Sequence, residues 1–159
     1  MPRTAHCAKS EIDRLQPLSR RILIRTPTMS TFSIGAAADF DYNQLLRDHL
    51  EKVFNERHAN RRMAALATLY NDDAVVVDPD GSRLGHRDIS AMVDDVLQRF
   101  PEDFSFTATG FGVGLGGVGY IPWQLGPPSG EAVVSGVDVA HIRDGRIQAI
   151  YVLIDPVVA

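Results

Sequence analysis

The sequence predicts an α+β domain in which helices come first and a run of antiparallel strands follows. Apolar residues recur at helical spacing in three segments between residues 41 and 100. After residue 101 the apolar residues alternate with polar ones, which is the period of strands. Only one short strand, residues 74–77, interrupts the helical part. Helices and strands are therefore segregated, which is typical of α+β rather than alternating α/β architecture.

The first helix is expected over residues 41–57, because one of its faces is continuously apolar. That face carries Tyr42, Leu45, Leu46, His49, Leu50, Val53 and Phe54. Asn60 is expected to cap a second, short helix that continues to about Tyr70. Asp88 is expected to open a third helix with its own apolar face, and Pro101 stops it because proline cannot continue a helix.

Four further strands are expected at residues 104–109, 118–125, 132–142 and 147–154. The stretch Pro127-Pro128-Ser129-Gly130 predicts a turn between the second and third of them. Asp144-Gly145 separates the last two, and this dipeptide favours a tight hairpin because both residues tolerate positive φ angles. The strands therefore follow one another as an antiparallel meander.

Composition and charge exclude several classes of function. The chain has 159 residues and a formal charge of −4, but residues 1–30 hold six bases and two acids, so the remainder carries −8. An acidic body argues against nucleic acid as a partner, since phosphate binding needs clustered Lys and Arg. No apolar run approaches the length of a membrane span. The single cysteine, Cys7, cannot form an intrachain disulfide, and we expect a cytoplasmic protein.

Residues 1–38 are expected to form a leader outside a single domain at residues 39–159. The leader is rich in Ser, Thr, Pro and Arg and has no sustained period. Three interpretations compete: a disordered tail, an organelle transit peptide, or an artefact upstream of a true start at Met29. Glu11 and Asp13 weigh against a transit peptide, because such peptides are poor in acids. We favour the disordered or artefactual leader.

Two patterns that suggest cofactors or metals do not fit their structural context. Residues 112–117 match G-x-G-x-x-G, but a strand follows where a dinucleotide site needs a helix. A hairpin is the better interpretation of these glycines. The histidines lack metal-ligand spacing, and no G-x-S-x-G nucleophile motif is present. The sequence therefore predicts no cofactor and no metal.

Asp78 is the first candidate for a functional carboxylate. It ends the apolar strand 74–77 and, by alternation, shares a face with Ala74 and Val76. It also precedes Pro79 and the turn Asp80-Gly81, and Asp is a common turn former in this position. Asp78 is therefore either a turn residue or a general base at the rim of the core.

Asp138 is the second candidate, because it lies in the middle of an apolar strand. Aspartate is depleted in strands and is seldom buried without a partner. Asp138 therefore either faces water from an edge strand or lies inside a pocket. His141 falls on the opposite face, so these two do not form a pair. His49, on the apolar helix face, is either a core histidine or a substrate-binding residue.

Four segments resemble the nuclear transport factor 2-like superfamily, which includes SnoaL-like polyketide cyclases, ketosteroid isomerases and limonene epoxide hydrolases. These segments are L-Y-N-D-D-A-V-V-V-D-P-D-G, G-H-R-D-I, W-Q-L-G-P-P and G-V-D-V-A-H-I-R-D-G-R-I, and the resemblance covers about residues 41–155. It implies a cone: a curved antiparallel sheet wrapped by three N-terminal helices around an apolar pocket. It also implies a homodimer through the outer face of the sheet.

The resemblance assigns roles to three positions. Asp78 matches the general base of the isomerases, and Asp138 matches the aspartic acid that helps to bind their oxyanion. Phe54 stands where those enzymes have a tyrosine, and phenylalanine cannot donate a hydrogen bond. Tyr70 is a candidate for supplying the hydroxyl instead. The Asp-Arg-Asp arrangement of the epoxide hydrolases has no counterpart, since Arg143 lies at a strand end.

We therefore expect a SnoaL-like enzyme, of isomerase, cyclase or dehydratase type, that acts on a small apolar molecule without a cofactor. Asp78 or Asp138 is the expected acid or base. The expected substrate-binding residues are Phe54, Tyr70, Tyr120, Trp123, Ile150 and Val152. The alternative is a non-catalytic ligand-binding or dimerisation module with the same fold.

Overall fold

The computed structural model describes residues 40–156, which contain all of the predicted helices and strands. The first helix, α1, spans Tyr42–His49 and continues as a π-helix, η1, over Leu50–Phe54. Helix α2 spans Ala59–Leu69 and α3 spans Gly85–Gln98. The predicted leader lies outside the described residues.

Two of the predicted helix starts are wrong. His58 precedes α2, and Asn60 lies within its first turn instead of capping it. Helix α3 begins at Gly85, and Asp88 lies in its first turn, where a carboxylate interacts favourably with the positive end of the helix dipole. Asp41 does cap α1, because its Oδ1 accepts a hydrogen bond of 2.8 Å from the backbone N–H of Gln44.

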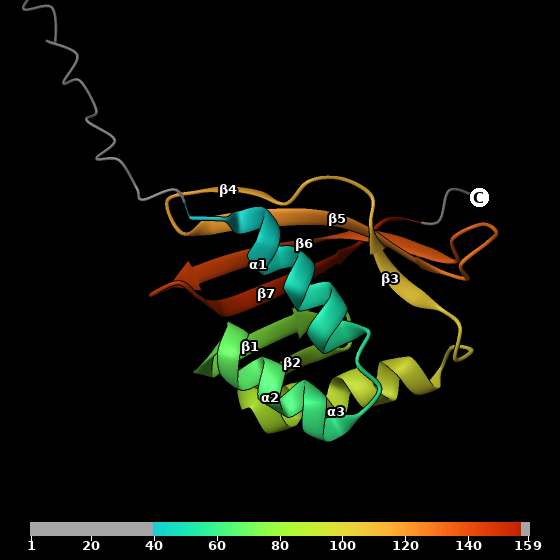
Figure 1. Ribbon diagram of the computed structural model, residues 1–159, viewed down its shortest axis with the longest axis horizontal. Coiled ribbons are helices and arrows are strands. Elements are labelled where there is room, and N and C mark those ends of the chain that lie inside the picture. Colours follow the sequence, from blue (N-terminus) through green and yellow to red (C-terminus); the bar gives the residue numbers. More distant parts are fainter. Residues whose placement is uncertain (1–39, 157–159) are drawn as a thin grey trace, which may run out of the picture. The chain divides into compact units, whose positions relative to one another are not determined.

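Seven strands form one sheet in the order β2-β1-β7-β6-β5-β3, with β4 paired to β5 (Figure 1). Their bounds are β1 Tyr70–Asp78, β2 Gly81–Leu84, β3 Ser105–Ala108, β4 Val113–Leu115, β5 Val118–Gly126, β6 Val134–Arg143 and β7 Arg146–Ile154. All pairs are antiparallel except β1 with β7, which are parallel. The sheet is therefore mixed, whereas the sequence predicted antiparallel pairing throughout.

Turn glycines form the hairpins that the sequence predicted. Gly116 and Gly117 have φ angles of 60° and 84° and connect β4 to β5, so the G-x-G-x-x-G segment is part of a hairpin. Asp144 and Gly145 have φ angles of 54° and 76° and connect β6 to β7. Strands β2 and β4 were not predicted. Both are short and largely exposed, so neither carries a clear apolar alternation.

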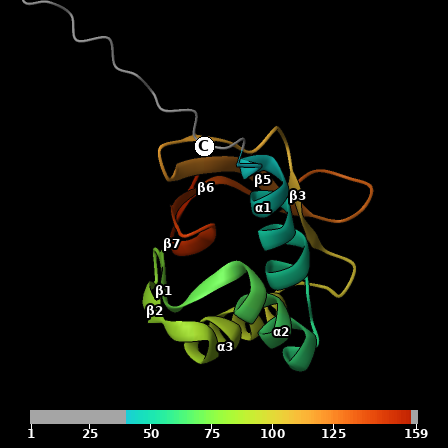
Figure 2. The ribbon, with the colours of Figure 1, turned by 60° about the vertical axis from the view of Figure 1, so that its left-hand side comes forward.

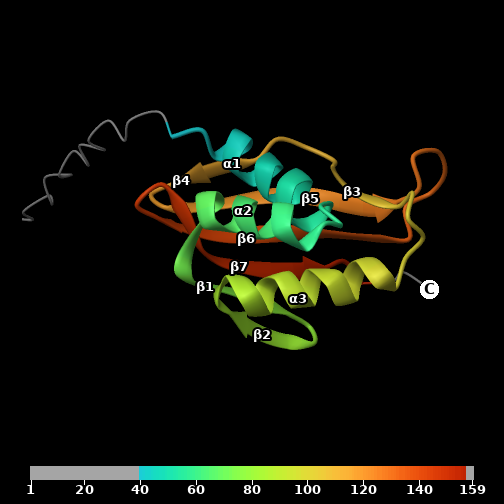
Figure 3. The same ribbon diagram turned by 60° about the horizontal axis from the view of Figure 1, so that its bottom comes forward.

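The helices cover one face of the sheet, and the sheet curves around them (Figures 2 and 3). The core lies between the two layers and includes Leu46 from α1, Leu66 from α2, Val93 from α3 and Ile121 from β5. A register shift in the β6–β7 pair lets both Ile147 and Ile150 be fully buried although their spacing is odd. Among residues 40–156, no helix combines the length and apolar character needed to cross a membrane.

A buried arginine joins the two helices that lie beside β1. Arg62 of α2 is fully buried, and its guanidinium forms an ion pair with Asp94 of α3 and donates a 3.0 Å hydrogen bond to Ser90. It also donates to the backbone carbonyl of Glu56. A buried charge is tolerated only when it is paired in this way. Arg62 thus fixes α3, which forms one wall of the cavity described next.

Candidate functional site

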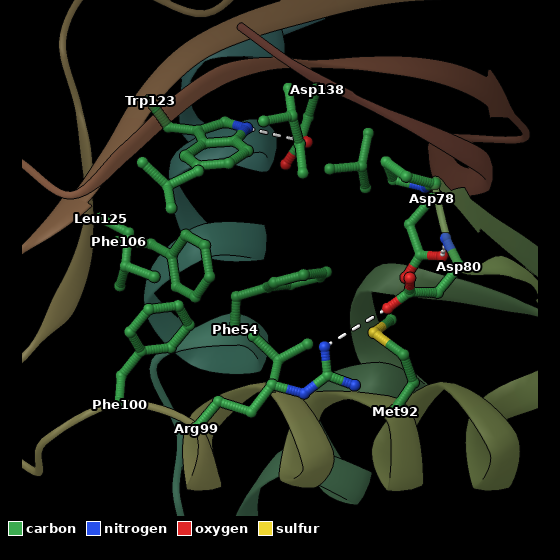
Figure 4. A pocket seen from close by; sticks show the side chains of 15 residues that line it. Phe54, Asp78, Asp80, Met92, Arg99, Phe100, Phe106, Trp123, Leu125 and Asp138 are labelled. Carbon is green, nitrogen blue, oxygen red and sulfur yellow. Dashed lines mark hydrogen bonds and ion pairs between the residues drawn. The ribbon is translucent and has the colours of Figure 1, made fainter. Parts of the chain in front are cut away.

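A cavity of about 290 Å³ lies between the inner face of the sheet and α3. Four aromatic rings form much of its wall: Phe54, Phe100, Phe106 and Trp123. Its charged side chains are Asp138, Asp78, Asp80 and Arg99. Figure 4 shows Asp138 beside Trp123 at one end, and Asp78 and Asp80 together in another part of the cavity, with Arg99 reaching toward Asp80. The cavity is therefore apolar in the middle and polar at both ends.

The aromatic wall is held by edge-to-face packing. The ring of Phe106 lies 5.6 Å from that of Phe54 and 5.3 Å from that of Trp123, at interplanar angles of 87° and 72°. Such pairs are favourable because the positive edge of one ring meets the negative face of the other. Gly136 makes room for the indole, since a Cβ at this position would lie 2.9 Å from Trp123 Cζ2. The wall is therefore a fixed surface.

Asp138 lies at the closed end of the cavity and is 2% exposed. Its strand, β6, is paired on both sides, which contradicts the interpretation as an edge-strand residue that faces water. Asp138 Oδ1 accepts a hydrogen bond of 2.9 Å from Trp123 Nε1, and Oδ2 lies 2.8 Å from His49 Nε2. A buried carboxylate is costly unless such donors satisfy it. These two contacts fix the orientation of the carboxyl group.

His49 continues the network away from the cavity. It is fully buried, and its Nδ1 lies 2.5 Å from the hydroxyl oxygen of Tyr70. Tyr70 is also fully buried, and this burial, together with the negative charge of Asp138, raises the pKa of its hydroxyl well above its usual value. Tyr70 therefore keeps its proton. Four side chains from α1, β1, β5 and β6 thus form one connected polar network behind the cavity wall.

The π-helix places His49 and Phe54 side by side. These residues are five apart, and in a regular α-helix of 3.6 residues per turn they would point in different directions. With the wider turn of η1, their ring centroids lie 4.8 Å apart, so His49 reaches Asp138 while Phe54 lines the cavity. Asn55 anchors the end of this turn, because its side chain forms hydrogen bonds with both the N–H and the carbonyl of Phe106. Single π turns occur frequently at functional sites.

Asp78 lies at the other polar end of the cavity. It is a turn residue and also a carboxylate at the rim of the core, which were the two interpretations of its sequence position. Its Oδ1 accepts a hydrogen bond of 2.9 Å from the backbone N–H of Asp80, so it holds the turn after β1. It is only partly buried, and it also lines the cavity. Beside it, Asp80 Oδ2 lies 3.3 Å from Arg99 Nη1, and both of these side chains are more than 60% exposed. This end is therefore the mouth of the cavity.

The structure distributes the predicted substrate-binding residues over three places. Phe54, Trp123 and Val152 line the cavity. Tyr70 and Ile150 are fully buried in the core and are not part of the lining, Tyr70 being behind Asp138 in the network. Tyr120 lies on the outer face and is 47% exposed, which corrects its assignment to the pocket wall. The reason is alternation, because Tyr120 and Trp123 are an odd number of residues apart on β5.

His49 is the functional partner that sequence reasoning did not assign to Asp138. The two residues are 89 positions apart, so no local spacing connects them. Each of the two is a polar residue on an otherwise apolar face. This shared feature is the sequence signal that could have linked His49 with Asp138. Across residues 40–156, no group of three His, Cys, Asp or Glu side chains is arranged to hold a metal ion.

Comparisons with known proteins agree with this architecture. The model of the SnoaL-like domain family matches residues 47–150. A candidate isomerase of the SnoaL-like family from Agrobacterium tumefaciens is 26% identical, with a TM-score of 0.67 over 73% of this chain and 98% of that one. A candidate ketosteroid isomerase from Kribbella flavida is 17% identical, with a TM-score of 0.57 over 75% and 81%. A candidate polyketide cyclase from Sinorhizobium meliloti is 15% identical, with a TM-score of 0.54 over 69% and 93%.

No curated protein matches the sequence. The last two structures share the fold alone with this chain, whereas the family model covers well over half of it. The predicted α+β fold and the predicted family are thereby confirmed: the chain belongs to the family of SnoaL-like domains.

Proposed function

We propose that this protein is a SnoaL-like enzyme that moves a proton on a small, mostly apolar molecule, in a reaction of isomerase, cyclase or dehydratase type. One observation carries the proposal: the Asp138 carboxyl group lines an apolar cavity while contacts with Trp123 Nε1–H and His49 Nε2 hold it in place. Asp138 is the proposed acid/base. The names of the SnoaL-like isomerase and the polyketide cyclase support this reaction class.

The chemistry follows from the free electron pairs of the carboxylate. A carboxylate has about four lone-pair sites, of which the contacts with Trp123 and His49 use two. A remaining pair can take a proton from a carbon next to a ligand carbonyl group. The C–H electrons then form an enolate, and the protonated Asp138 can return the proton to another carbon of the same ligand. Such proton transfer by a positioned side chain contributes roughly 10²–10⁴-fold to a rate.

The size of the cavity limits the ligand. A volume of about 290 Å³ is at the lower end of the range of roughly 300–1,000 Å³ that is usual for ligand pockets. A ligand that touches Asp138 extends past Phe54 toward Asp78 at the mouth. We therefore propose a compact apolar ligand with one carbonyl group at the Asp138 end. Asp78 is the alternative acid or base and requires a separate test.

Deuterium exchange tests this proposal before the reaction is known. The protein is incubated in D₂O with a panel of ketones of terpenoid, polyketide and steroid type, and mass spectrometry measures deuterium incorporation. We expect exchange for at least one ketone and, for Asp138→Asn, a loss of about 100-fold or more. Asp78→Asn should stay within a few-fold, because an asparagine oxygen can still accept the N–H of Asp80.

Asp95→Asn is the matched control, since Asp95 is exposed on α3. Exchange that survives Asp138→Asn at the wild-type rate contradicts the proposal. If Asp78→Asn abolishes exchange instead, Asp78 is the base.

A second function, non-catalytic ligand binding, is favoured by one observation. Among the described residues that line the cavity, none has a hydroxyl side chain that could polarise a carbonyl group, and Phe54 is an apolar ring. Ligand binding without any exchange by the wild-type protein would favour this function over the first. We further propose that the outer face of the sheet pairs with a second copy of the chain.

A further inference from the structure

We infer that Tyr70 and His49 are positioning residues that hold Asp138 as a proton acceptor, through hydrogen bonds that all run in one direction. The inference rests on the contacts of Tyr70 with His49, of His49 with Asp138, and of Asp138 with Trp123. It depends on the proposed function only for its catalytic consequence, because the positions of the protons can be measured without a substrate.

Tyr70 is the first donor in this series of hydrogen bonds. Its hydroxyl is fully buried, and the raised pKa keeps the proton on its oxygen. A buried O–H that finds no acceptor destabilises the folded state, because it has lost its hydrogen bonds to water. Within the described part of the chain, the acceptor that the structure provides for this O–H is His49 Nδ1. Tyr70 therefore donates, and Nδ1 carries no proton.

The remaining steps follow from the chemistry of the two rings. A neutral imidazole has one N–H, so a bare Nδ1 places the proton on Nε2, which donates to Asp138 Oδ2. The indole N–H of Trp123 can only donate, and it donates to Oδ1. Both oxygens of Asp138 thus accept hydrogen bonds, and the group matches a carboxylate anion. Asp138 also lines the cavity, so the lone pairs that these contacts leave free are then the place where a proton can arrive.

The reverse direction leaves a group unsatisfied. A protonated Asp138 could donate to His49 Nε2, and the proton on Nδ1 would then point at the Tyr70 oxygen. The Tyr70 O–H would have no acceptor among the described residues. The family resemblance implies that Asp138 is a neutral acid that donates to an oxyanion. The network assigns it the opposite starting state, that of a base.

Nitrogen NMR of the ¹⁵N-labelled full chain tests this inference. Long-range ¹H–¹⁵N correlation spectra show which ring nitrogen of each histidine carries the proton. The signals of His49 are identified by elimination, by replacing His6, His58, His86 and His141 singly with Gln. We expect a neutral His49 with a protonated Nε2 and a bare Nδ1. A proton on Nδ1 would overturn the inference, and so would a doubly protonated ring.

Tyr70→Phe provides the second measurement, with Tyr42→Phe as the control, since Tyr42 lies on the same helix as His49 but its hydroxyl accepts the N–H of Gly117. We expect Tyr70→Phe to shift the His49 ring signals toward the other tautomer and to lower the exchange rate without a matching loss of ketone affinity. Unchanged His49 signals would contradict the role of Tyr70. The His49 tautomer of the wild type decides the inference even if this variant does not fold.

The two proposals fail in different ways. If the Nε2–H tautomer is found but no ketone exchanges deuterium, the positioning network stands and the proposed enzyme does not. If exchange depends on Asp138 but His49 carries its proton on Nδ1, the enzyme stands and the direction of the network is wrong.

Discussion

Asp78 and Asp138 line the same cavity, and their surroundings give them different chemistry. Asp138 is buried, and its partners are the N–H groups of an indole and an imidazole, so no strong cation neutralises it. Asp78 is partly exposed, and one of its oxygens is engaged by its own turn. A base works best when water is excluded and when its lone pairs face the ligand. Asp138 meets the first condition better than Asp78, because it is buried.

Tyr70 allows a test of the network through the dependence of stability on pH. Its pKa is raised well above 10.0 in the folded state, first by burial and then by the charge of Asp138. The folded protein therefore keeps the Tyr70 proton at a pH where the unfolded chain loses it. The resulting stability is complete below about pH 10 and is lost as the pH rises further.

We expect the free energy of unfolding of the wild type to fall more steeply above pH 10 than that of Tyr70→Phe. The difference in slope should be about 1.4 kcal/mol per pH unit, the value for one proton. Urea unfolding at several pH values between 9 and 11 measures both slopes. Parallel curves for the wild type and Tyr70→Phe would show that Tyr70 ionises as freely in the folded protein as in the unfolded chain.

At the scale of elements, the π turn η1 connects the network to the cavity. It rotates Phe54 onto the same side as His49, so one helix supplies both the partner of the acid and part of the aromatic wall. A regular α-helix over the same residues would lose one of the two. Glu51 and Lys52 are exposed within this turn, so its extra residue can be removed without deleting a core side chain.

Deletion of Glu51 should therefore restore a regular α-helical turn in which Phe54 follows His49 by four residues, so the two rings stay on one face of the helix. We expect a loss of stability of about 1 kcal/mol or less, because no core side chain is removed and Phe54 keeps its place beside His49. The matched control is Glu51→Ala, which keeps the chain length and should change stability by less than about 0.5 kcal/mol. Thermal and urea unfolding measure both variants. A deletion that costs about 3 kcal/mol or more, as much as the loss of a buried phenylalanine ring, would mean that a regular α-helical turn cannot place Phe54 in the wall.

The sequence predicted those helices and turns that local periodicity and turn chemistry encode. The apolar faces of the three helices and the hairpin turn at Asp144-Gly145 are local signals, and the structure confirms them. The parallel pairing of β1 with β7 is a contact between distant segments, so no local signal predicts it. The short edge strand β2 has the sequence Gly-Ser-Arg-Leu, which carries no strand period.

In the candidate site, too, features with a local sequence signal could be predicted, and features that depend on distant contacts could not. Asp138 could be singled out because it is a charged residue on an apolar strand face. Its hydrogen bonds with His49 and Trp123 depend on how α1, β5 and β6 meet in space. The change from α- to π-helical geometry after His49 also has no clear sequence signature, since the apolar pattern fits either helix.

At the scale of the whole domain, the outer face of the sheet carries a continuous apolar surface. Tyr120, Val139 and Tyr151 are directly opposite one another on β5, β6 and β7. Pro122, Val137 and Leu153 form the neighbouring row. Tyr120, Tyr151 and Leu153 are each about half exposed, and no helix among the described residues covers this face (Figure 3). Contiguous apolar patches of this kind mark interaction surfaces.

If two copies pair through this face, a charge at its centre should separate them. Tyr151→Glu is expected to weaken dimerisation at least about 30-fold, since central aromatic side chains contribute roughly 2 kcal/mol or more to such interfaces. Sedimentation equilibrium at several concentrations measures the dissociation constant.

The matched control is Met63→Glu, which places the same charge on an exposed apolar position of α2, on the helical side of the sheet. We expect this control to leave the dimer intact and both variants to keep the stability of the folded subunit, because their side chains project from the surface. A wild-type protein that stays monomeric, or equal weakening by both substitutions, would exclude the sheet face as the dimer interface. Because β7 also supplies Val152 and Ile154 to the cavity, loss of the dimer should then be compared with the deuterium exchange rate. A lower rate in the monomer would mean that pairing of the outer faces stabilises the strand that closes the pocket.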